Sequence, residues 1–78
     1  MTLDKAKKNI SYTIEALELE DEYLQARLVH FGFCPGVEVR VKRWAPIFKD
    51  PILVEVDGSQ IMISRDHAKF LRITEVSA

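Results

Sequence analysis

The sequence predicts a small, mainly β domain of the α+β type, in which five short strands curl into a partly open barrel and one helix follows the first strand. Three observations support this class. Apolar and polar residues alternate in several short stretches, as they do in strands with one buried face. The stretch from Leu24 to Phe31 has helical apolar spacing instead. Asp57-Gly58, between two alternating stretches, is typical of a tight hairpin.

Length and composition predict one domain over residues 1–78, too small for a deep cleft. Eleven basic and twelve acidic residues give a net charge of -1, without the overall basic field of nucleic-acid binders. Cys34 has no second cysteine to pair with and the N-terminus has no signal-peptide pattern, so a cytoplasmic protein is expected. Apolar runs reach only three residues, far short of the roughly 20 that span a bilayer, so no direct membrane insertion is expected.

The N-terminal third of the chain predicts a lead-in, a strand and a helix. Residues 1–8 carry three lysines and little apolar content, which indicates a loosely held segment. From residue 10 to residue 16, Ile, Tyr, Ile and Ala alternate with polar residues and predict the first strand. Four acids between Glu18 and Glu22 favour a helix N-terminus. Leu24, Leu28 and Phe31 form an apolar stripe, and Gly32 ends a helix of about three turns.

A second strand is predicted from Gly36 to Arg43, with three valines on one face and charged residues on the other. If the alternation of inward and outward side chains continued, Arg43 would point inward and Trp44 outward. We therefore expect either a bulge there or a strand end with a partly exposed tryptophan. The loop that follows, residues 45–50, carries two large apolar side chains in a segment that would ordinarily be polar.

A hairpin with a type I' turn is predicted at Asp57-Gly58, because both central residues of that turn need a positive φ. The two-residue loop sets the register, which pairs residues 56 with 59, 55 with 60, 54 with 61, 53 with 62, and 52 with 63. One face then carries the predicted core residues Ile52, Val54, Val56, Ile61 and Ile63. The other face is mostly polar but includes the apolar cross-strand pair Leu53 and Met62.

The C-terminal part predicts a short capped turn and a closing strand. Ser64 is placed to cap residues 65–68, and Leu71 and Ile73 alternate with Arg72 and Thr74. Small barrels of the SH3-like and OB types both accommodate five such strands. The helix lies between the first and second strands, where an SH3-like barrel has a long variable insertion, so the SH3-like barrel is favoured.

The order of these residues resembles that of the FeoA family. The resemblance rests on Leu28, Phe31-Gly32-Phe33, Pro35-Gly36, Val39, Ala45-Pro46, Asp50-Pro51-Ile52, Val54, Val56, Gly58 and Ala68. It covers about residues 2–76; Lys49 stands where the family usually has glycine, and Asn9 where an early proline-glycine turn usually occurs. The resemblance implies a small cytosolic SH3-like protein that serves the bacterial ferrous iron transporter FeoB, a membrane protein with a cytosolic GTP-binding domain.

Residues that could bind metal or catalyse a reaction are few. His30, Cys34 and His67 are the only soft or borderline metal ligands, and Gly32 and Pro35 interrupt the helix that would bring the first two together. We therefore expect neither a metal site nor a cofactor. Ser64, Asp66 and His67 share one turn, where a nucleophile, a base and an orienting group cannot line up. Since the chain also has no phosphate-binding loop motif, no enzymatic activity is expected.

Two surfaces are candidate binding sites. A basic strip beside aromatic residues is typical of platforms for single-stranded nucleic acid; it comprises Arg40, Lys42, Arg43 and Lys49. With a net charge of -1, a solvated strand face is the favoured explanation of this strip. An apolar patch on a monomer usually marks a partner site. The predicted partner-binding residues are Trp44, Ile47, Phe48, Leu53 and Met62, and the alternative is that Ile47 and Phe48 fold back over an open barrel end.

The favoured interpretation is a monomeric protein-interaction module that modulates a FeoB-type transporter from the cytosolic side, recruited to the membrane by that partner. Two alternatives remain. One is a direct metal sensor or chaperone, related to the similar SH3-like domain of iron-dependent repressors. The other is a nucleic-acid-binding small barrel, whose affinity would fall steeply with salt; no nucleic-acid partner is expected.

Overall fold

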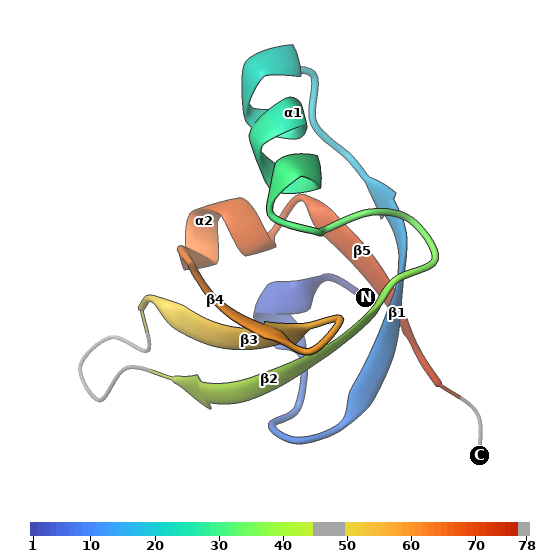
Figure 1. Ribbon diagram of the computed structural model, residues 1–78, viewed down its shortest axis with the longest axis vertical. Coiled ribbons are helices and arrows are strands. Elements are labelled where there is room, and N and C mark those ends of the chain that lie inside the picture. Colours follow the sequence, from blue (N-terminus) through green and yellow to red (C-terminus); the bar gives the residue numbers. More distant parts are fainter. Residues whose placement is uncertain (45–49, 77–78) are drawn as a thin grey trace.

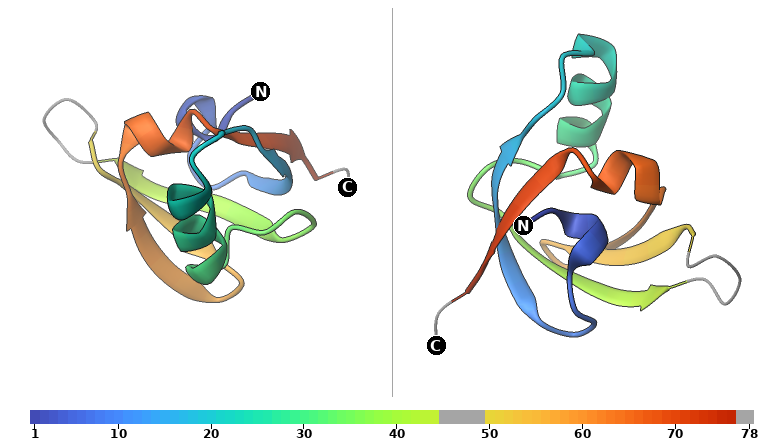
Figure 2. Two further views of the ribbon diagram at one scale, coloured as in Figure 1. Left: turned by 90° about the horizontal axis from the view of Figure 1, so that it is seen from above. Right: turned by 180° about the vertical axis from the view of Figure 1, so that it is seen from behind.

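A computed structural model describes residues 1–44 and 50–76 of the chain. Its elements are η1 (Leu3–Lys5), β1 (Ser11–Leu17), α1 (Glu22–His30), β2 (Glu38–Trp44), β3 (Ile52–Val56), β4 (Ser59–Ile63), α2 (Arg65–Ala68) and β5 (Leu71–Glu75). All strand pairs are antiparallel, and the sheet order is β4-β3-β2-β1-β5. The sheet curls around one core, and α1 projects from one end of it (Figures 1 and 2). The predicted small α+β class with five strands is confirmed.

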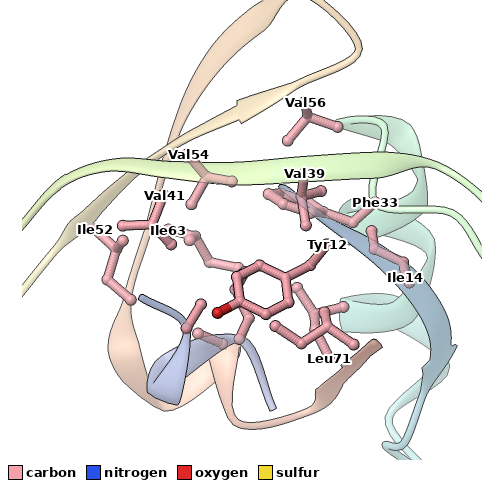
Figure 3. Packing of buried hydrophobic residues seen from close by; sticks show 14 of the residues in the cluster. Tyr12, Ile14, Phe33, Val39, Val41, Ile52, Val54, Val56, Ile63 and Leu71 are labelled. Atoms are coloured by element: carbon pink, nitrogen blue, oxygen red, sulfur yellow. The ribbon is translucent and has the colours of Figure 1, made fainter. Parts of the chain in front are cut away.

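Tyr12 lies at the centre of the core and is 2% exposed (Figure 3). Its ring is surrounded by apolar side chains from β2, β3 and β5, including Val41, Ile52 and Leu71. The phenolic oxygen accepts a hydrogen bond from the backbone N–H of Lys7 at 3.0 Å. A buried hydroxyl needs such a partner, so the segment before β1 is tied to the centre of the core.

The prediction of a loosely held N-terminal lead-in is wrong. Leu3 and Ala6 are buried in the core, while the lysines of the same segment are exposed. Ile73 of β5 donates its backbone N–H to the carbonyl of Met1 at 2.8 Å, and Thr2 bridges Arg72. The two buried residues are three apart, so one helical turn turns both toward the core. The segment thereby covers an edge of the sheet that would otherwise be open.

Helix α1 begins and ends as its sequence predicts. The Asp21 carboxylate caps it by accepting hydrogen bonds from the N–H groups of Tyr23 at 3.0 Å and Leu24 at 3.1 Å. At the other end, Gly32 has φ 103° and donates to the carbonyl of Val29, while the N–H of Phe33 reaches the carbonyl of Leu28, both at 2.9 Å. This pair of bonds is the Schellman motif, which needs a residue with positive φ at the position of Gly32.

The helix packs less tightly than its apolar stripe predicts. Leu28 is the one buried residue of α1, Leu24 is half-buried, and Phe31 is 43% exposed. The stripe is therefore buried only at Leu28 and, in part, at Leu24. Because α1 projects from the end of the barrel, its N-terminal half lies beyond the strands (Figure 1).

Two bulges set which side chains of β1 and β2 reach the core. In β2 the register shifts between Val41 and Arg43, which confirms the expected bulge and pairs Trp44 with Ile52. In β1 it shifts between Ile14 and Ala16, so that Leu17 instead of Ala16 lies opposite the buried Leu71. The predicted alternation through Ala16 is wrong at this point. An extra residue in a strand exchanges the two faces for everything beyond it.

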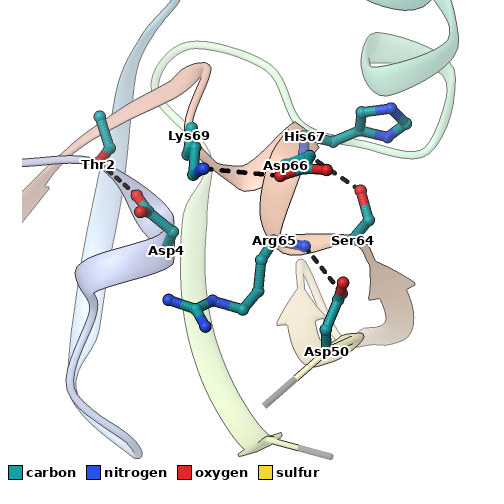
Figure 4. A network of polar contacts seen from close by, with 8 residues as sticks. All are labelled: Thr2, Asp4, Asp50, Ser64, Arg65, Asp66, His67 and Lys69. Atoms are coloured by element: carbon teal, nitrogen blue, oxygen red, sulfur yellow. Dashed lines mark hydrogen bonds and ion pairs between the residues drawn. The ribbon is translucent and has the colours of Figure 1, made fainter. Parts of the chain in front are cut away.

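The β3–β4 hairpin has the predicted register at all five pairs. Asp57 and Gly58 have φ values of 48° and 84°, as the expected type I' turn requires. Four of the five predicted core residues are buried, and Ile61 is only half-buried because β4 is the edge strand. Ser64 accepts the predicted capping hydrogen bond from the N–H of His67 at 3.2 Å (Figure 4).

Candidate functional site

An open groove of about 410 Å³ lies between α1 and the edge of the sheet. One wall is the face of α1 that the sheet leaves uncovered, and the other is β4 with the start of α2. The groove is lined by Asp21, Tyr23, Leu24, Arg27, Leu28, Phe31, Phe33, Ile61, Met62, Ile63, Ser64 and His67. Its lining is mostly apolar.

The α1 wall has buried side chains next to the barrel and exposed side chains farther from it. Leu28 and Phe33 are buried and hold the end of the helix against the barrel. Above them Tyr23 is 73% exposed and Phe31 43% exposed. The Schellman motif at Gly32 fixes this arrangement, because it directs the chain from the helix end down into the core at Phe33.

The β4 wall is apolar because an edge strand faces the core only partly. Met62 is 58% exposed and lies opposite Leu53, on the face of the hairpin away from the core. Ile61 and Ile63 belong to the opposite face and contribute the part of the wall nearest the barrel interior. A large exposed methionine is a common feature of binding surfaces, since its flexible thioether adapts to different partners.

Charged side chains lie around the apolar lining and differ between its two ends. The helix N-terminus brings Asp21 into the lining and places the exposed Glu20 and Glu22 beside it. Toward the other end, the guanidinium carbon of Arg27 lies 5.7 Å from the centroid of the Phe31 ring. His67 contributes from the first turn of α2. The groove therefore has an acidic rim at the start of α1, where Asp21 lines it and Glu20 precedes Asp21 in the chain, and a basic side chain, Arg27, near its end.

The structure separates the predicted partner-binding residues. Trp44 pairs with Ile52 and packs against the core, whereas Leu53 and Met62 lie on the other face of the hairpin. The guanidinium carbon of Arg65 lies 5.9 Å from the centroid of the Trp44 ring, and the backbone N–H of Arg65 donates to Asp50 at 3.0 Å (Figure 4). Ile47 and Phe48 lie outside the described residues. Of the three described members of this set, only Met62 lines the groove.

The predicted basic strip is interleaved with acids. Arg40 donates a hydrogen bond to the Ser11 hydroxyl at 2.6 Å and lies opposite Glu55 on β3. Lys42 is half-buried at the bulge and Arg43 is exposed. Lys49 lies outside the described residues. Neighbouring opposite charge lowers the positive potential that a nucleic-acid platform needs.

The candidate metal ligands do not form a cluster. His30 ends α1 with its ring against Phe31, Cys34 lies in the next turn with its Sγ 3.7 Å from the carbonyl of Val29, and His67 lines the groove. Within residues 1–44 and 50–76, no group of three or more histidine, cysteine, aspartate or glutamate side chains is placed to hold a metal ion.

Sequence reasoning did not assign Tyr23, Phe31 or Ile61 to a binding surface. Phe31 was assigned to the apolar packing stripe, since periodicity identifies an apolar face but not what covers it. A signal was available in the short length of the helix and in the apolar residues Tyr23 and Val29, which lie off the stripe of Leu24, Leu28 and Phe31. More apolar side chains than the core can bury indicate a second surface.

A family model described as the FeoA domain matches residues 1–75. The chain belongs to the FeoA family. That match covers all eight elements of the structure, from η1 to β5. Proteins of the FeoA family have an accessory role in ferrous iron transport, which is the general function that the resemblance implies. A comparison with curated protein sequences finds no match.

Solved structures of FeoA proteins have the same fold. The FeoA protein from Chlorobium tepidum is 25% identical, with a TM-score of 0.89 over 99% of this chain and 71% of its own. Iron(II) transport protein A from Clostridium thermocellum is 29% identical, with a TM-score of 0.90 over 97% of this chain and 46% of its own. A zinc complex of FeoA from Stenotrophomonas maltophilia is 26% identical, with a TM-score of 0.82 over 95% of this chain and 89% of its own.

The predicted SH3-like barrel is confirmed, because the Stenotrophomonas protein is described as a procaryotic SH3 domain protein. The fold also occurs in IdeR from T. acidophilum, which is 22% identical, with a TM-score of 0.83 over 97% of this chain and 34% of its own. At that identity the likeness concerns the fold alone. In the part of the FeoA chain that is described, none of the helices is long and apolar enough to cross a membrane.

Proposed function

We propose that this chain is a non-enzymatic accessory protein of ferrous iron transport that binds the cytosolic part of a FeoB-type transporter through the groove between α1 and β4. Membership of the FeoA family supports the transport context. The observation that carries the docking site is the exposure of Phe31, Met62 and Tyr23 around one apolar hollow. Contiguous exposed apolar surface on a small protein usually marks a binding site.

The energetic argument favours the groove over the rest of the surface. Aromatic side chains that enter the centre of an interface each contribute about 2 kcal/mol or more, whereas rim charges contribute little. Phe31 and Tyr23 are aromatic, and Met62 is flexible and faces them across the groove. The charged outer face of β2 and β3 offers Arg40 and Glu55, which already neutralise one another in part. The groove is therefore the surface on which a partner would gain most.

The experiment compares two residues that lie two positions apart and have equal exposure. Phe31 lines the groove and Val29 does not, yet both are 43% exposed. We expect Phe31→Lys to weaken binding to the detergent-solubilised transporter by about 2 kcal/mol, roughly thirtyfold. Val29→Lys serves as the matched control and should bind as tightly as the parent protein, because it adds the same charge outside the groove.

Binding is measured anaerobically by titrating labelled protein into the transporter, with and without guanine nucleotide and ferrous iron. Saturable binding that Phe31→Lys weakens and Val29→Lys preserves would support the proposal. Dependence on nucleotide would show that the module responds to the state of the GTP-binding domain. Equal loss in both variants would exclude the groove. Absence of binding, together with stoichiometric ferrous iron binding by the chain alone, would favour the metal-sensor alternative.

A further inference from the structure

The groove has a hydrogen-bonding side as well as an apolar one, because β4 is an edge strand of the sheet. In a two-residue hairpin the residues that flank the turn, Val56 and Ser59, exchange hydrogen bonds, and the pairs alternate from there. The backbone N–H and C=O groups of Gln60 and Met62 therefore point away from β3. Within residues 1–44 and 50–76, no other group forms a hydrogen bond with these outward atoms.

The two edge strands of the sheet differ in whether their outward backbone groups are hydrogen-bonded. The other edge strand, β5, is covered: Ile73 donates to the carbonyl of Met1, and Arg72 is bridged by Thr2. At β4 the neighbouring element is α1, which stands beside the strand and across the groove (Figure 2). An exposed edge next to an apolar hollow is the arrangement by which proteins bind extended peptides, with backbone pairing along the edge and alternate side chains in the hollow.

The charge around the groove indicates what such a peptide carries. Glu20, Asp21 and Glu22 are exposed at the start of α1, and none forms an ion pair with another described residue, whereas Glu18 is paired with Arg72. A volume of about 410 Å³ is near the lower end of ligand pockets, which are roughly 300–1,000 Å³, so it suits one or two large side chains. A complementary segment combines one apolar anchor with basic residues that reach the acidic rim.

We propose that the groove binds an extended segment of a partner protein that pairs with the free edge of β4, inserts an apolar side chain against Phe31 and Met62, and places basic residues beside Glu20 and Asp21. This inference rests on the proposed docking function and specifies the chemistry of the partner at that site. An amphipathic helix in the groove and a second copy of the chain are the competing occupants.

The test uses two fluorescein-labelled octapeptides, each with one central leucine, threonine around it and three lysines at either the N-terminal or the C-terminal end. We expect at least one to bind the full chain saturably. Two N-methylated versions of that peptide are then compared, one methylated at the odd-numbered backbone amides and one at the even-numbered amides. Only one of these two groups of amides faces β4, so methylation of that group should weaken binding at least tenfold, and methylation of the other group less than twofold. Equal effects of both sets, helical circular dichroism of the bound peptide, or no binding of either peptide would overturn the proposal.

Charge and occupancy are tested on the protein. Glu20→Lys together with Asp21→Asn, which removes the charge of Asp21 but keeps a capping oxygen, should weaken peptide binding at least fivefold, whereas Glu15→Lys, on an exposed acid of β1 outside the groove lining, should leave it unchanged. An equal effect of Glu15→Lys would contradict the acidic rim. Dimerisation of the chain alone that Met62→Lys abolishes would instead assign the groove to a second copy.

The two proposals fail separately. Transporter binding that depends on Phe31 but not on Val29, without peptide binding, would retain the docking function and reject the extended segment. Peptide binding with the predicted N-methyl pattern, without transporter binding, would retain the extended segment and assign it to a different partner protein.

Discussion

Replacing Gly32 tests whether the end of α1 sets the geometry of the groove. Gly32 has φ 103°, and a Cβ added there would lie 3.2 Å from Cγ1 of Val56. Gly36 has a similar φ of 91°, but an added Cβ would meet nothing within 4 Å. Both substitutions by alanine cost about 1–2 kcal/mol of backbone strain. Gly32→Ala alone also crowds the Val56 side chain, which must move by a few tenths of an ångström, and overpacking of this kind adds about 1–3 kcal/mol.

The free energy of unfolding, measured by urea denaturation, should therefore fall by at least about 1 kcal/mol more for Gly32→Ala than for Gly36→Ala. In a domain of this size that difference corresponds to roughly 4–8 °C in Tm. Val56→Ala in the Gly32→Ala background should recover part of the difference, because it removes the crowded methyl group. Gly32→Ala should also weaken peptide and transporter binding, since the contact lies under the α1 wall.

Equal destabilisation by the two alanines would refute this reasoning. It would mean that backbone strain alone accounts for the loss and that the approach of Gly32 to Val56 is relieved without cost. A Gly32→Ala protein of reduced stability that binds as tightly as the parent would separate the helix end from the groove.

Three further substitutions test the packing. Leu3→Ala should lower the free energy of unfolding by about 2–5 kcal/mol, because Leu3 is fully buried. Lys5→Ala, on the exposed side of the same turn, should change it by less than about 0.5 kcal/mol. Small effects of both substitutions would show that this segment is held loosely. Tyr12→Phe should cost about 1 kcal/mol in urea unfolding, since the N–H of Lys7 loses its acceptor; a stability gain would show that water replaces it. Arg65→Met should alter tryptophan fluorescence and cost about 0.5–1 kcal/mol by removing the cation beside Trp44; an unchanged spectrum would argue against that contact.

Local chemistry allowed much of the fold to be predicted from the sequence. Asp57-Gly58 specified both the turn type and the register of the hairpin, because few residue pairs tolerate positive φ at two successive positions. Gly32 specified the end of α1 for the same reason, and Ser64 specified the start of α2 through a hydrogen bond within its own turn. The phase break at Trp44 predicted the bulge in β2, since a tryptophan on the solvent face would lose its burial.

What surrounds an apolar residue was decided only by the tertiary structure. The lysine-rich segment gave no sign that Leu3 and Ala6 are core residues. They are buried because this segment lies along the edge strand β5, where Thr2 bridges Arg72. Phe31 looked like a core residue, and it is exposed because α1 projects beyond the strands. Periodicity records which side chains share a face, but burial depends on segments far away in the sequence. The groove between α1 and β4 joins residues about thirty to forty positions apart, so only the folded chain brings its two walls together.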